Sequence, residues 1–376
     1  MILSAEQEMV REAIRAFAQE QLWPHAARWD REHHFPREAI QGLAALGACG
    51  ICVPEEYGGA NLDMLSLALV LEEVAAGDGG TSTAISVTNC PVNAILLRYA
   101  SAPQKKQWLV PLAQGKMLGA FCLTEPHAGS DASTLRTSAE RDGEGWRING
   151  VKQFITSGKN GQVAIVIAVT DKAAGKKGMS AFIVPTDAPG YRVGRLEDKL
   201  GQRSSDTALI HFDECRIPFE NLIGAEGEGY KIALGALEGG RIGIAAQSVG
   251  MARSAFDFAL DYAKQRESFG QPIFSHQAVG FRLADCATQL EAARQLVWHA
   301  ASLRDAGRPC LKEAAMAKLF ASEMAERVCS AAIQTLGGYG VVADFPLERI
   351  YRDVRVCQIY EGTSDVQKML ITRALA

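Results

Sequence analysis

The sequence lacks a strong excess of charge of either sign, and it lacks any long hydrophobic run. Its 376 residues hold 39 Lys and Arg against 43 Asp and Glu, which gives a formal net charge of −4. No stripe of basic residues could follow a phosphate backbone, so nucleic acid is excluded as the expected partner. No apolar segment is long enough to cross a bilayer, which argues against membrane insertion. The hydrophobic share of 48% is nevertheless enough to fill the cores of two or three domains.

The start of the chain also lacks the basic residues and the apolar stretch of a signal peptide, so we expect a cytoplasmic protein. A protein of the mitochondrial matrix, with its transit peptide already removed, is the alternative. Nine cysteines are scattered along the chain, and Cys49 and Cys52 have CxxC spacing. Because no second pair or histidine supplies the remaining ligands of a zinc site, we expect no metal. Buried thiols in a reducing compartment are expected, with a redox role for this pair as the alternative.

Three blocks of the chain differ in the period of their hydrophobic residues. Residues 1–118 show a helical period, residues 119–224 a period close to two, and residues 225–376 a helical period again. The long stripes of the third block are joined by short connections rich in Gly and Pro, as in an antiparallel bundle. We therefore expect an α+β multidomain fold. It consists of an N-terminal all-α domain, a small middle β-barrel or sandwich domain, and a C-terminal four-helix bundle.

Local signals support these blocks. Ser4 and Gln7 have the spacing of a capping box at the start of the first helix. In the middle block, Asp142-Gly143 and Asn149-Gly150 both predict tight hairpins between strands. The apolar run from Val163 to Val169 has the length of a buried strand.

Glu361 is the most informative single residue. A hydrophobic and aromatic run, residues 356–360, precedes it and would desolvate its carboxylate. Desolvation raises the pKa of a carboxyl group and makes it a usable proton acceptor near neutral pH. Gly362 and the hydroxyl residues after it indicate a turn whose bare backbone can approach a ligand closely. The alternative is a carboxylate that only caps the final helix, which the neighbouring serine or aspartate could also do.

Two segments of the middle block combine an aromatic residue with hydroxyl groups. Residues 120–131, Ala-Phe-Cys-Leu-Thr-Glu-Pro-His-Ala-Gly-Ser-Asp, present the Thr124 hydroxyl and then a turn with free amides beside Ser130. Such a loop can donate several hydrogen bonds to a flat polar ring or to phosphate oxygens, but it can also be an ordinary turn. In the second segment, Phe154 could cover one face of a planar cofactor while Thr156 donates to its edge.

The C-terminal block has two comparable segments. Residues 266–270, Arg-Glu-Ser-Phe-Gly, precede His276 and Gln277 at the start of a long predicted helix. Residues 334–338, Gln-Thr-Leu-Gly-Gly, end another predicted helix in a glycine cluster, where backbone can meet the phosphates or adenine of a dinucleotide. A plain helix C-cap is the alternative interpretation of these glycines.

Taken together and in order, these segments resemble the acyl-CoA dehydrogenase family, of its short-chain or short branched-chain type, along the whole chain. The matching elements are Phe121 to Asp131, Phe154 to Thr156, Gly201 to Asp206, Arg266 to Gly270, Gln334 to Gly338 and Tyr360 to Thr363. The resemblance implies an FAD enzyme that oxidises the Cα–Cβ bond of acyl-CoA thioesters. It also implies a homotetramer built as a dimer of dimers, with electron-transfer flavoprotein as the acceptor.

The same resemblance implies the FAD contacts, and no Rossmann or P-loop motif occurs in the chain. Within one subunit these contacts fall on Phe121, Cys122, Leu123, Thr124, Gly129, Ser130, Phe154, Ile155, Thr156, Thr363, Ser364 and Asp365. Contacts from the neighbouring subunit fall on Arg266, Ser268, Phe269, Gln277, Gln334, Thr335, Leu336, Gly337 and Gly338. Dimerisation would then be a condition for holding the cofactor.

For catalysis, the resemblance implies that Glu361 takes the α-proton while the β-hydrogen leaves as hydride to flavin N5. The backbone N–H of Glu361 would support the thioester carbonyl as enolate charge develops. Substrate contacts are implied for Ser130, Glu238, Arg241 and Gly362. Some relatives place the base one residue before Arg241, but this chain has Gly240 there, which leaves Glu361 as the matching candidate.

Other residues bear on substrate and alternatives. Residues 238–247 look most like the short-chain members, so we expect short acyl-CoA, straight or α-methyl-branched, with medium-chain substrates also open. The pathways implied are fatty acid β-oxidation and branched-chain amino acid catabolism. Phe154 stands where many relatives have Trp, and His127 is expected to be an exposed turn residue, with tuning of flavin access as the alternative. An acyl-CoA oxidase or flavin monooxygenase on the same scaffold is the second hypothesis, and a silent acyl-CoA-binding protein the third. Glu361 speaks against the second, and the flavin-contacting residues speak against the third.

Overall fold

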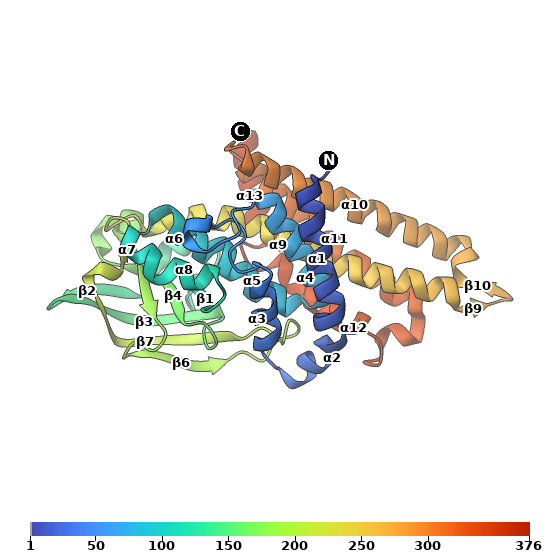
Figure 1. Ribbon diagram of the computed structural model, residues 1–376, viewed down its shortest axis with the longest axis horizontal. Coiled ribbons are helices and arrows are strands. Elements are labelled where there is room, and N and C mark those ends of the chain that lie inside the picture. Colours follow the sequence, from blue (N-terminus) through green and yellow to red (C-terminus); the bar gives the residue numbers. More distant parts are fainter. Residues whose placement is uncertain (1) are drawn as a thin grey trace.

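The computed structural model describes residues 2–376 and shows helices, then a sheet, then helices (Figure 1). This order confirms the expected fold class. The sheet occupies one end of an elongated molecule, and a small hairpin formed by β9 (Glu267–Ser268) and β10 (Gln271–Pro272) lies at the opposite end. The long helix α9 (Gly229–Gln265) runs from the sheet to this hairpin. Among residues 2–376, no helix has the length and apolar character that a membrane span requires.

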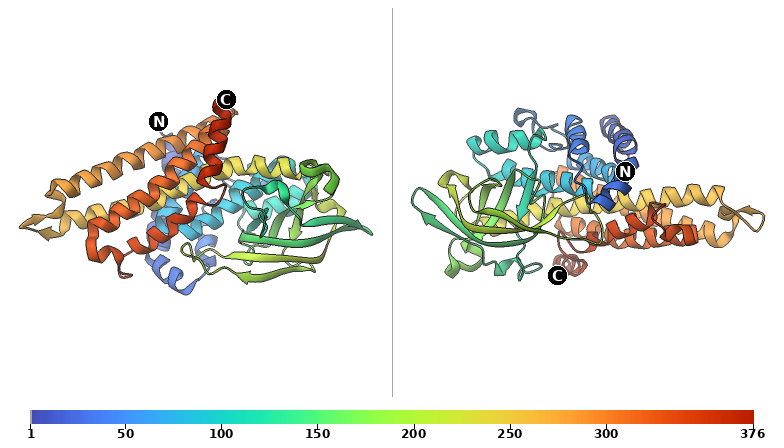
Figure 2. Two further views of the ribbon diagram at one scale, coloured as in Figure 1. Left: turned by 180° about the vertical axis from the view of Figure 1, so that it is seen from behind. Right: turned by 90° about the horizontal axis from the view of Figure 1, so that it is seen from below.

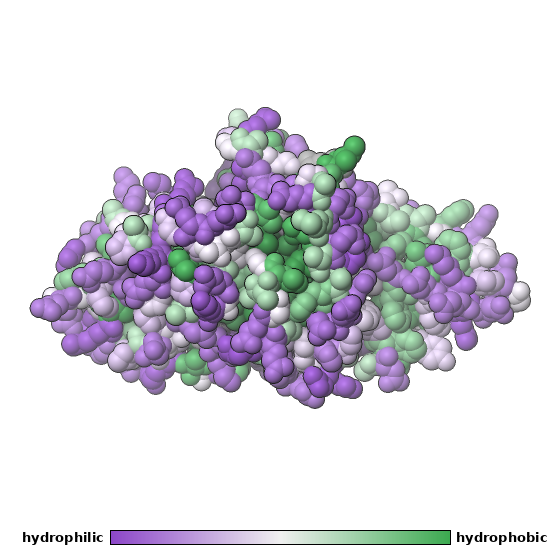
Figure 3. All heavy atoms as spheres, viewed as in Figure 1, coloured by the Kyte–Doolittle hydropathy of each residue, from purple (hydrophilic) through white to green (hydrophobic). Residues whose placement is uncertain are grey.

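Eight α-helices make up the N-terminal block as far as the structure describes it, from residue 2 to 118. They are α1 (Ala5–Phe17), α2 (Trp23–Glu32), α3 (Arg37–Ala45), α4 (Met64–Gly77), α5 (Gly79–Val87), α6 (Ala94–Tyr99), α7 (Ala102–Gln104) and α8 (Val110–Ala113). The predicted capping box starts α1, because Ser4 Oγ accepts from Gln7 N–H and the Gln7 side chain accepts from Ser4 N–H. Helix α4 is apolar around most of its circumference because it packs between α1 and α9. The space-filling view, seen from the same side as Figure 1, shows an apolar area near the centre of the molecule (Figure 3).

The middle block is one mixed sheet. Its strands are β1 (Gly119–Cys122), β2 (Ser138–Asp142), β3 (Gly145–Thr156), β4 (Val163–Val169), β5 (Met179–Pro185), β6 (Tyr191–Leu196), β7 (Thr207–Pro218) and β8 (Leu222–Ile223). Their order is β6-β7-β3-β2-β4-β5-β8, and β1 pairs with β4 in parallel. Alternate residues of β4 enter two cores: Ile165 and Ile167 pack toward the helices, whereas Val166 packs with Trp146 and Phe182.

The two hairpin predictions have opposite outcomes. Asp142-Gly143 lies in the turn between β2 and β3, as predicted. The prediction for Asn149-Gly150 is wrong, because β3 continues through this dipeptide with a shift in register against β7. The Asn149 side chain exchanges hydrogen bonds with Glu214 on β7, and a Cβ at residue 150 would lie 2.5 Å from Thr137 Oγ1. The dipeptide therefore forms an irregularity within a strand, where only glycine leaves room for the adjacent chain.

The C-terminal block is built from long helices. They are α9, α10 (Gln277–Asp305), α11 (Leu311–Leu336), α12 (Leu347–Val354) and α13 (Ser364–Leu375). Figure 2 shows α9, α10 and α11 running side by side, and α11 packs extensively on α9. Buried alanines such as Ala314, Ala317 and Ala321 let α11 approach its neighbours closely. Helix α9 of this bundle also contacts strand β5 of the sheet, and Glu361 lies against α9 at Gly240.

Candidate active site

Glu361 lies in a strained turn between a 3₁₀ turn, Arg355–Gln358, and helix α13. Its φ is 55°, in the left-handed region, and Gly362 follows with a φ of 90°. A side chain in this region costs free energy on the order of 1 kcal/mol or more, so the surroundings must hold it there. Lys318 Nζ donates to Gly362 O at 2.7 Å, and Gln367 Nε2 donates to the carbonyl oxygens of both residues. The turn is thus fixed on its C-terminal side.

The Glu361 carboxylate points into the protein. Although the residue as a whole is partly accessible, its Oε2 atom is buried and has no hydrogen-bond partner among residues 2–376. A Cβ built on Gly240 would lie 2.5 Å from this oxygen, so the carboxylate rests directly against the backbone of α9. Only glycine permits this approach.

The charge of Glu361 is set by burial and by two nearby cations. Burial raises the pKa of Glu361 to about 7, while Arg241 and Lys318 act in the opposite direction. This confirms the pKa shift that the hydrophobic flank predicts. Burial also lowers the pKa of Lys318, to about 8, and lowers the pKa of Arg241. At neutral pH the site therefore holds a carboxylate that is near its midpoint and open to a proton.

The two predicted flavin segments of the sheet lie side by side. Gln153 N–H donates to Thr124 O at 2.9 Å, and Lys152 Nζ donates to Leu123 O at 2.9 Å. Lys152 also forms a buried ion pair with Glu125 at 2.8 Å. Glu125 in turn accepts from the backbone N–H groups of residues 136 and 137, which ties down the loop between them. The ends of β1 and β3 consequently form one rigid edge.

This edge fits FAD, the cofactor that the resemblance implies. The Phe154 side chain is held at a φ of 58° and is 63% exposed, beside the partly exposed Thr124 and Thr156. A large exposed aromatic next to hydroxyl groups offers both a face and hydrogen bonds to a planar ring. Gly129 and Ser130 are exposed, whereas Cys122, Leu123 and Ile155 are buried and can offer a ligand only their backbone.

The residues predicted on the phosphate side start the last helix. Thr363 caps α13 by accepting from Val366 N–H at 3.3 Å. The capping residue is therefore Thr363, and not Glu361, Ser364 or Asp365, which the sequence offers as alternatives. Ser364 Oγ is buried without a partner among residues 2–376, and Asp365 is exposed. An orphaned hydroxyl at a helix N-terminus is compatible with an anionic or hydroxyl-bearing ligand group.

The residues predicted to serve a neighbouring subunit gather at the far end of the molecule. Arg266, Ser268 and Phe269 lie at the end of α9 and in β9–β10, and Gln277 starts α10 (Figure 1). Phe269 is 95% exposed. The Tyr262 and Tyr339 rings, 6.4 Å apart, join this end of α9 to the turn after Gln334–Gly338. The neighbouring-subunit set therefore lies at the hairpin end of the bundle, away from the sheet that carries the two flavin segments.

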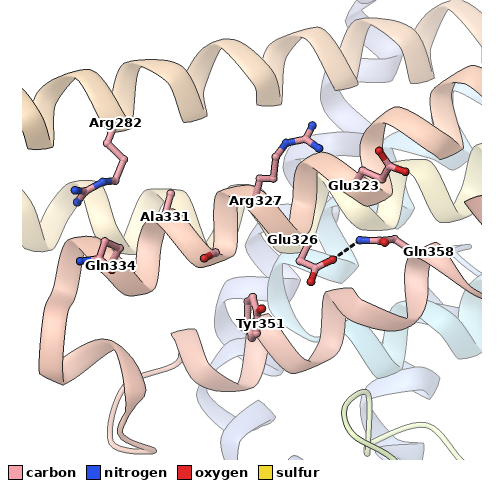
Figure 4. A pocket seen from close by; sticks show the side chains of 9 residues that line it. Arg282, Glu323, Glu326, Arg327, Ala331, Gln334, Tyr351 and Gln358 are labelled. Atoms are coloured by element: carbon pink, nitrogen blue, oxygen red, sulfur yellow. Dashed lines mark hydrogen bonds between the residues drawn. The ribbon is translucent and has the colours of Figure 1, made fainter.

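A cavity of about 620 Å³ opens beside this second set, between α10, α11 and α12 (Figure 4). Charged and amide side chains dominate its wall: Arg282, Glu323, Glu326, Arg327, Gln334 and Gln358. Gln334 belongs both to this wall and to the predicted FAD contacts. Thr335 and Leu336 are buried, and Gly337 and Gly338 are exposed.

The predicted substrate residues differ in their surroundings. Arg241 is buried on α9 beside Glu361, and Gly362 forms the turn. Glu238 is instead paired with Arg304 at 3.2 Å and accepts from Cys310 Sγ. His127 is an exposed turn residue whose Nε2 lies 3.1 Å from Thr134 O.

The two thiols with CxxC spacing are uncharged at neutral pH. Cys49 is buried and Cys52 is partly buried, and burial raises the pKa of each to about 12. Over residues 2–376, no group of three or more His, Cys, Asp or Glu side chains is placed to hold a metal ion.

Sequence reasoning missed Lys318 and Gln367, the two side chains that hold the Glu361 turn. Both are fully buried. A signal for Lys318 was present, because it is a single cation within the buried alanine stripe of α11. A fully buried lysine requires a polar partner, which here is a backbone carbonyl. Gln367 carries no comparable signal, since glutamine is ordinary in a C-terminal helix.

Comparisons with known proteins agree along the whole chain. The descriptions acyl-CoA dehydrogenase N-terminal domain, middle domain and C-terminal domain match residues 4–116, 120–215 and 227–376. The mitochondrial short-chain specific acyl-CoA dehydrogenase of Rattus norvegicus is 45% identical over 364 residues, 97% of this chain and 88% of that protein.

Two solved structures have the same fold. Butyryl-CoA dehydrogenase from Megasphaera elsdenii is 40% identical with a TM-score of 0.98, covering 100% of this chain and 99% of that one. A chain from a study of the electron transferring flavoprotein of Acidaminococcus fermentans is 45% identical with a TM-score of 0.99, with the same coverage. The chain therefore belongs to the acyl-CoA dehydrogenase family, and it is an FAD-dependent acyl-CoA dehydrogenase.

Proposed function

We propose that the protein converts short-chain acyl-CoA, straight or α-methyl-branched, to trans-2-enoyl-CoA, with Glu361 as the α-proton acceptor. The observation that carries this proposal is the buried Glu361 carboxylate, whose Oε2 has no hydrogen-bond partner in the described residues and whose pKa is about 7. A general base is most effective when its pKa lies near the working pH, because enough of it is then ionised while it still binds a proton well.

The residues around Glu361 have separate tasks in this mechanism. Arg241 and Lys318 keep part of Glu361 ionised in a buried place. The turn fixed by Lys318 and Gln367 presents the Glu361 backbone N–H to the thioester carbonyl, where enolate charge develops as the α-proton leaves. When bound, FAD supplies the acceptor for the β-hydrogen and its electron pair. Phe154, Thr124 and Thr156 would hold its ring system at the edge of the sheet.

The distribution of the cofactor residues supports an oligomer. One set lies at the sheet and the start of α13, and the other lies at the far end of the bundle. A second copy that brings its far end to this sheet would complete the site. The proposed assembly is a homotetramer arranged as a dimer of dimers. Arg266→Ala should then lose FAD and weaken the dimer together, as gel filtration with flavin absorbance would show; unchanged flavin content would contradict the shared site.

Substrate and acceptor are proposed from the relatives. The rat relative is named as short-chain specific and the Megasphaera relative as a butyryl-CoA dehydrogenase, so C4 chains are the first expectation. Branched-chain substrates rest on the sequence resemblance alone. Electron-transfer flavoprotein is the proposed acceptor, because a chain with the same fold comes from a study of such a flavoprotein.

The experiment is anaerobic mixing of the yellow holoenzyme with butyryl-CoA, followed by a panel of straight C4 to C12 and branched acyl-CoAs. A dehydrogenase loses the yellow absorbance of its oxidised flavin and stays bleached until an electron acceptor is added. Rapid recolouring in air would indicate the alternative, an acyl-CoA oxidase. Failure of every acyl-CoA to bleach the flavin would contradict the proposal.

A further inference from the structure

Behind Glu361, four polar side chains form a closed ring of hydrogen bonds. Tyr360 Oη donates to Gln247 Oε1 at 2.7 Å, and Gln247 Nε2 donates to Thr83 Oγ1 at 2.6 Å. Thr83 Oγ1 donates to Gln202 Oε1 at 2.6 Å, and Gln202 Nε2 returns to Tyr360 Oη at 3.4 Å. Within the ring each group donates once and accepts once, so these bonds run in one direction and polarise one another. Outside the ring, Gln247 Nε2 also donates to Gly79 O at 2.7 Å.

The ring joins all three blocks of the chain. Thr83 lies on α5 of the N-terminal block, and Gln202 lies in the loop between β6 and β7 of the sheet block. Gln247 lies on α9, and Tyr360 immediately precedes Glu361. Thr83, Gln202 and Gln247 are buried, and Tyr360 is half-buried. The loop that supplies Gln202 is the Gly201–Asp206 segment, to which the flavin and substrate contacts assign no role.

This loop is wedged between the other two blocks. Gln202 N–H donates to Asp353 Oδ1 on α12, and Gln202 Nε2 also donates to Asp353 O at 3.1 Å. A Cβ on Gly201 would lie 2.5 Å from the Arg352 carbonyl carbon. On the other side, Ser204 Oγ donates to Asp78 Oδ2 at 2.6 Å. These contacts on both sides hold Gln202 in place beside the ring.

We propose that Gln202 is a positioning residue for the reaction: through the ring it holds Tyr360 and thereby fixes the N-terminal side of the turn that presents Glu361. The strained φ of Glu361 needs support from both sides. Lys318 and Gln367 supply it after Glu361, and the ring supplies it before. This inference rests on the proposed role of Glu361 as the base.

The test compares Gln202→Met with a matched control, Gln104→Met. Gln104 is also buried and also links two blocks, because its Nε2 donates to Glu220 O and Leu222 O, but it takes no part in the ring. Both variants are purified as FAD holoenzymes, and their melting temperatures are measured. Anaerobic stopped-flow mixing with butyryl-CoA gives the flavin reduction rate, and its dependence on butyryl-CoA gives the apparent substrate affinity.

We expect Gln202→Met to slow flavin reduction by about tenfold to a hundredfold while substrate affinity stays close to that of the wild type. Gln104→Met should reduce at the wild-type rate, even where its melting temperature falls equally. Equal reduction rates in the two variants would overturn the proposal. Should Gln202→Met fail to fold, Tyr360→Phe decides: it removes the ring hydroxyl and, outside the ring, only the 3.6 Å contact of that hydroxyl with Cys357 Sγ. An unchanged rate in Tyr360→Phe would also overturn the proposal.

Two further variants separate this inference from the proposed function. In the double variant Gln202→Met/Tyr360→Phe, the losses should be less than additive in free energy, because each single change already opens the same ring. Fully additive losses would contradict a shared ring. Glu361→Gln serves as the reference for the base: if it keeps its rate, the proposed function fails, whereas if it alone is slow, only the role of Gln202 fails.

Discussion

Two buried carboxylates, Asp353 and Glu361, lie close together in the sequence and share a pKa of about 7, raised by burial. Their hydrogen bonds differ. Asp353 Oδ1 accepts from Gln202 N–H and its Oδ2 faces Arg349 at 3.5 Å, whereas Glu361 Oε2 has no partner within residues 2–376. Burial alone therefore does not distinguish a base from a structural acid. What distinguishes them is whether the carboxylate oxygens already have hydrogen-bond or ion-pair partners.

The backbone shows the same contrast. Asp353 lies in the regular helix α12, and Glu361 lies in the left-handed region next to Gly362. A helix needs no special support, but the turn depends on Lys318 and Gln367 and on the ring behind it. Strain of this kind is retained where it presents a group for chemistry. The comparison predicts that replacing each carboxylate by its amide affects the flavin reduction rate very differently.

The largest expected difference is in flavin reduction. Glu361→Gln should keep FAD and bind acyl-CoA but lose the reduction rate by about a thousandfold or more, because an amide cannot accept the α-proton. Asp353→Asn keeps an oxygen that accepts from Gln202 N–H, so its rate should stay within about tenfold of the wild type. Anaerobic stopped-flow measurement with butyryl-CoA checks both variants. Similar losses in the two would remove the distinction between base and structural acid.

The sequence signals that point to Glu361 as the base are local. Glu361, the hydrophobic run before it and Gly362 are contiguous, and the structure adds the pKa shift that they indicate. The supports are not local: Gly240, Lys318 and Gln202 come from α9, α11 and the sheet block. No periodicity shows that three distant segments meet at one turn.

The Asn149-Gly150 error has a similar origin. An Asn-Gly dipeptide between β-formers favours a hairpin, but the partner of Asn149 is Glu214 on another strand. Strand β3 continues through the dipeptide because Asn149 is bonded to that distant strand and Gly150 packs closely against Thr137. The three-block order survives such errors, since it depends on period over many residues rather than on one turn.

A second expected difference is in stability against pH. The folded pKa of Glu361, about 7, lies above its ordinary value of 4.5, so the folded state binds the proton more tightly than the unfolded state. Its contribution is fully present below the unfolded pKa and is lost as pH rises through about 7, by up to about 3 kcal/mol. Glu361→Gln should therefore be more stable than the wild type at pH 8, with a smaller difference at pH 5.

Asp353→Asn sharpens this comparison. It removes a similar ionisation but leaves Arg349 without its closest carboxylate, at a cost of about 1–3 kcal/mol. Urea unfolding at both pH values measures the two variants. Stabilisation of Asp353→Asn equal to that of Glu361→Gln at pH 8 would show that the Arg349 contact contributes little.

The smallest expected effect concerns the charge near the base. Flavin reduction by the wild type should rise with pH through about 7, as Glu361 ionises. The Lys318 ammonium favours that ionisation, so Lys318→Met should move the midpoint upward, by about one unit, and slow the reaction most at pH 6 to 7. The pKa of Lys318 itself is about 8, so the electrostatic part of the difference should vanish above that pH, and only the effect of the lost hydrogen bond to Gly362 O should remain.

Gln367→Met is the matched control for this last change, because Gln367 donates to the same Gly362 carbonyl without carrying a charge. Loss of the hydrogen bond alone should lower the rate at every pH and leave the midpoint where it is. Loss of the charge should move the midpoint. If both variants move the midpoint equally, the support of the turn and not the positive charge of Lys318 sets the ionisation of Glu361. The electrostatic role of Lys318 would then have to be abandoned.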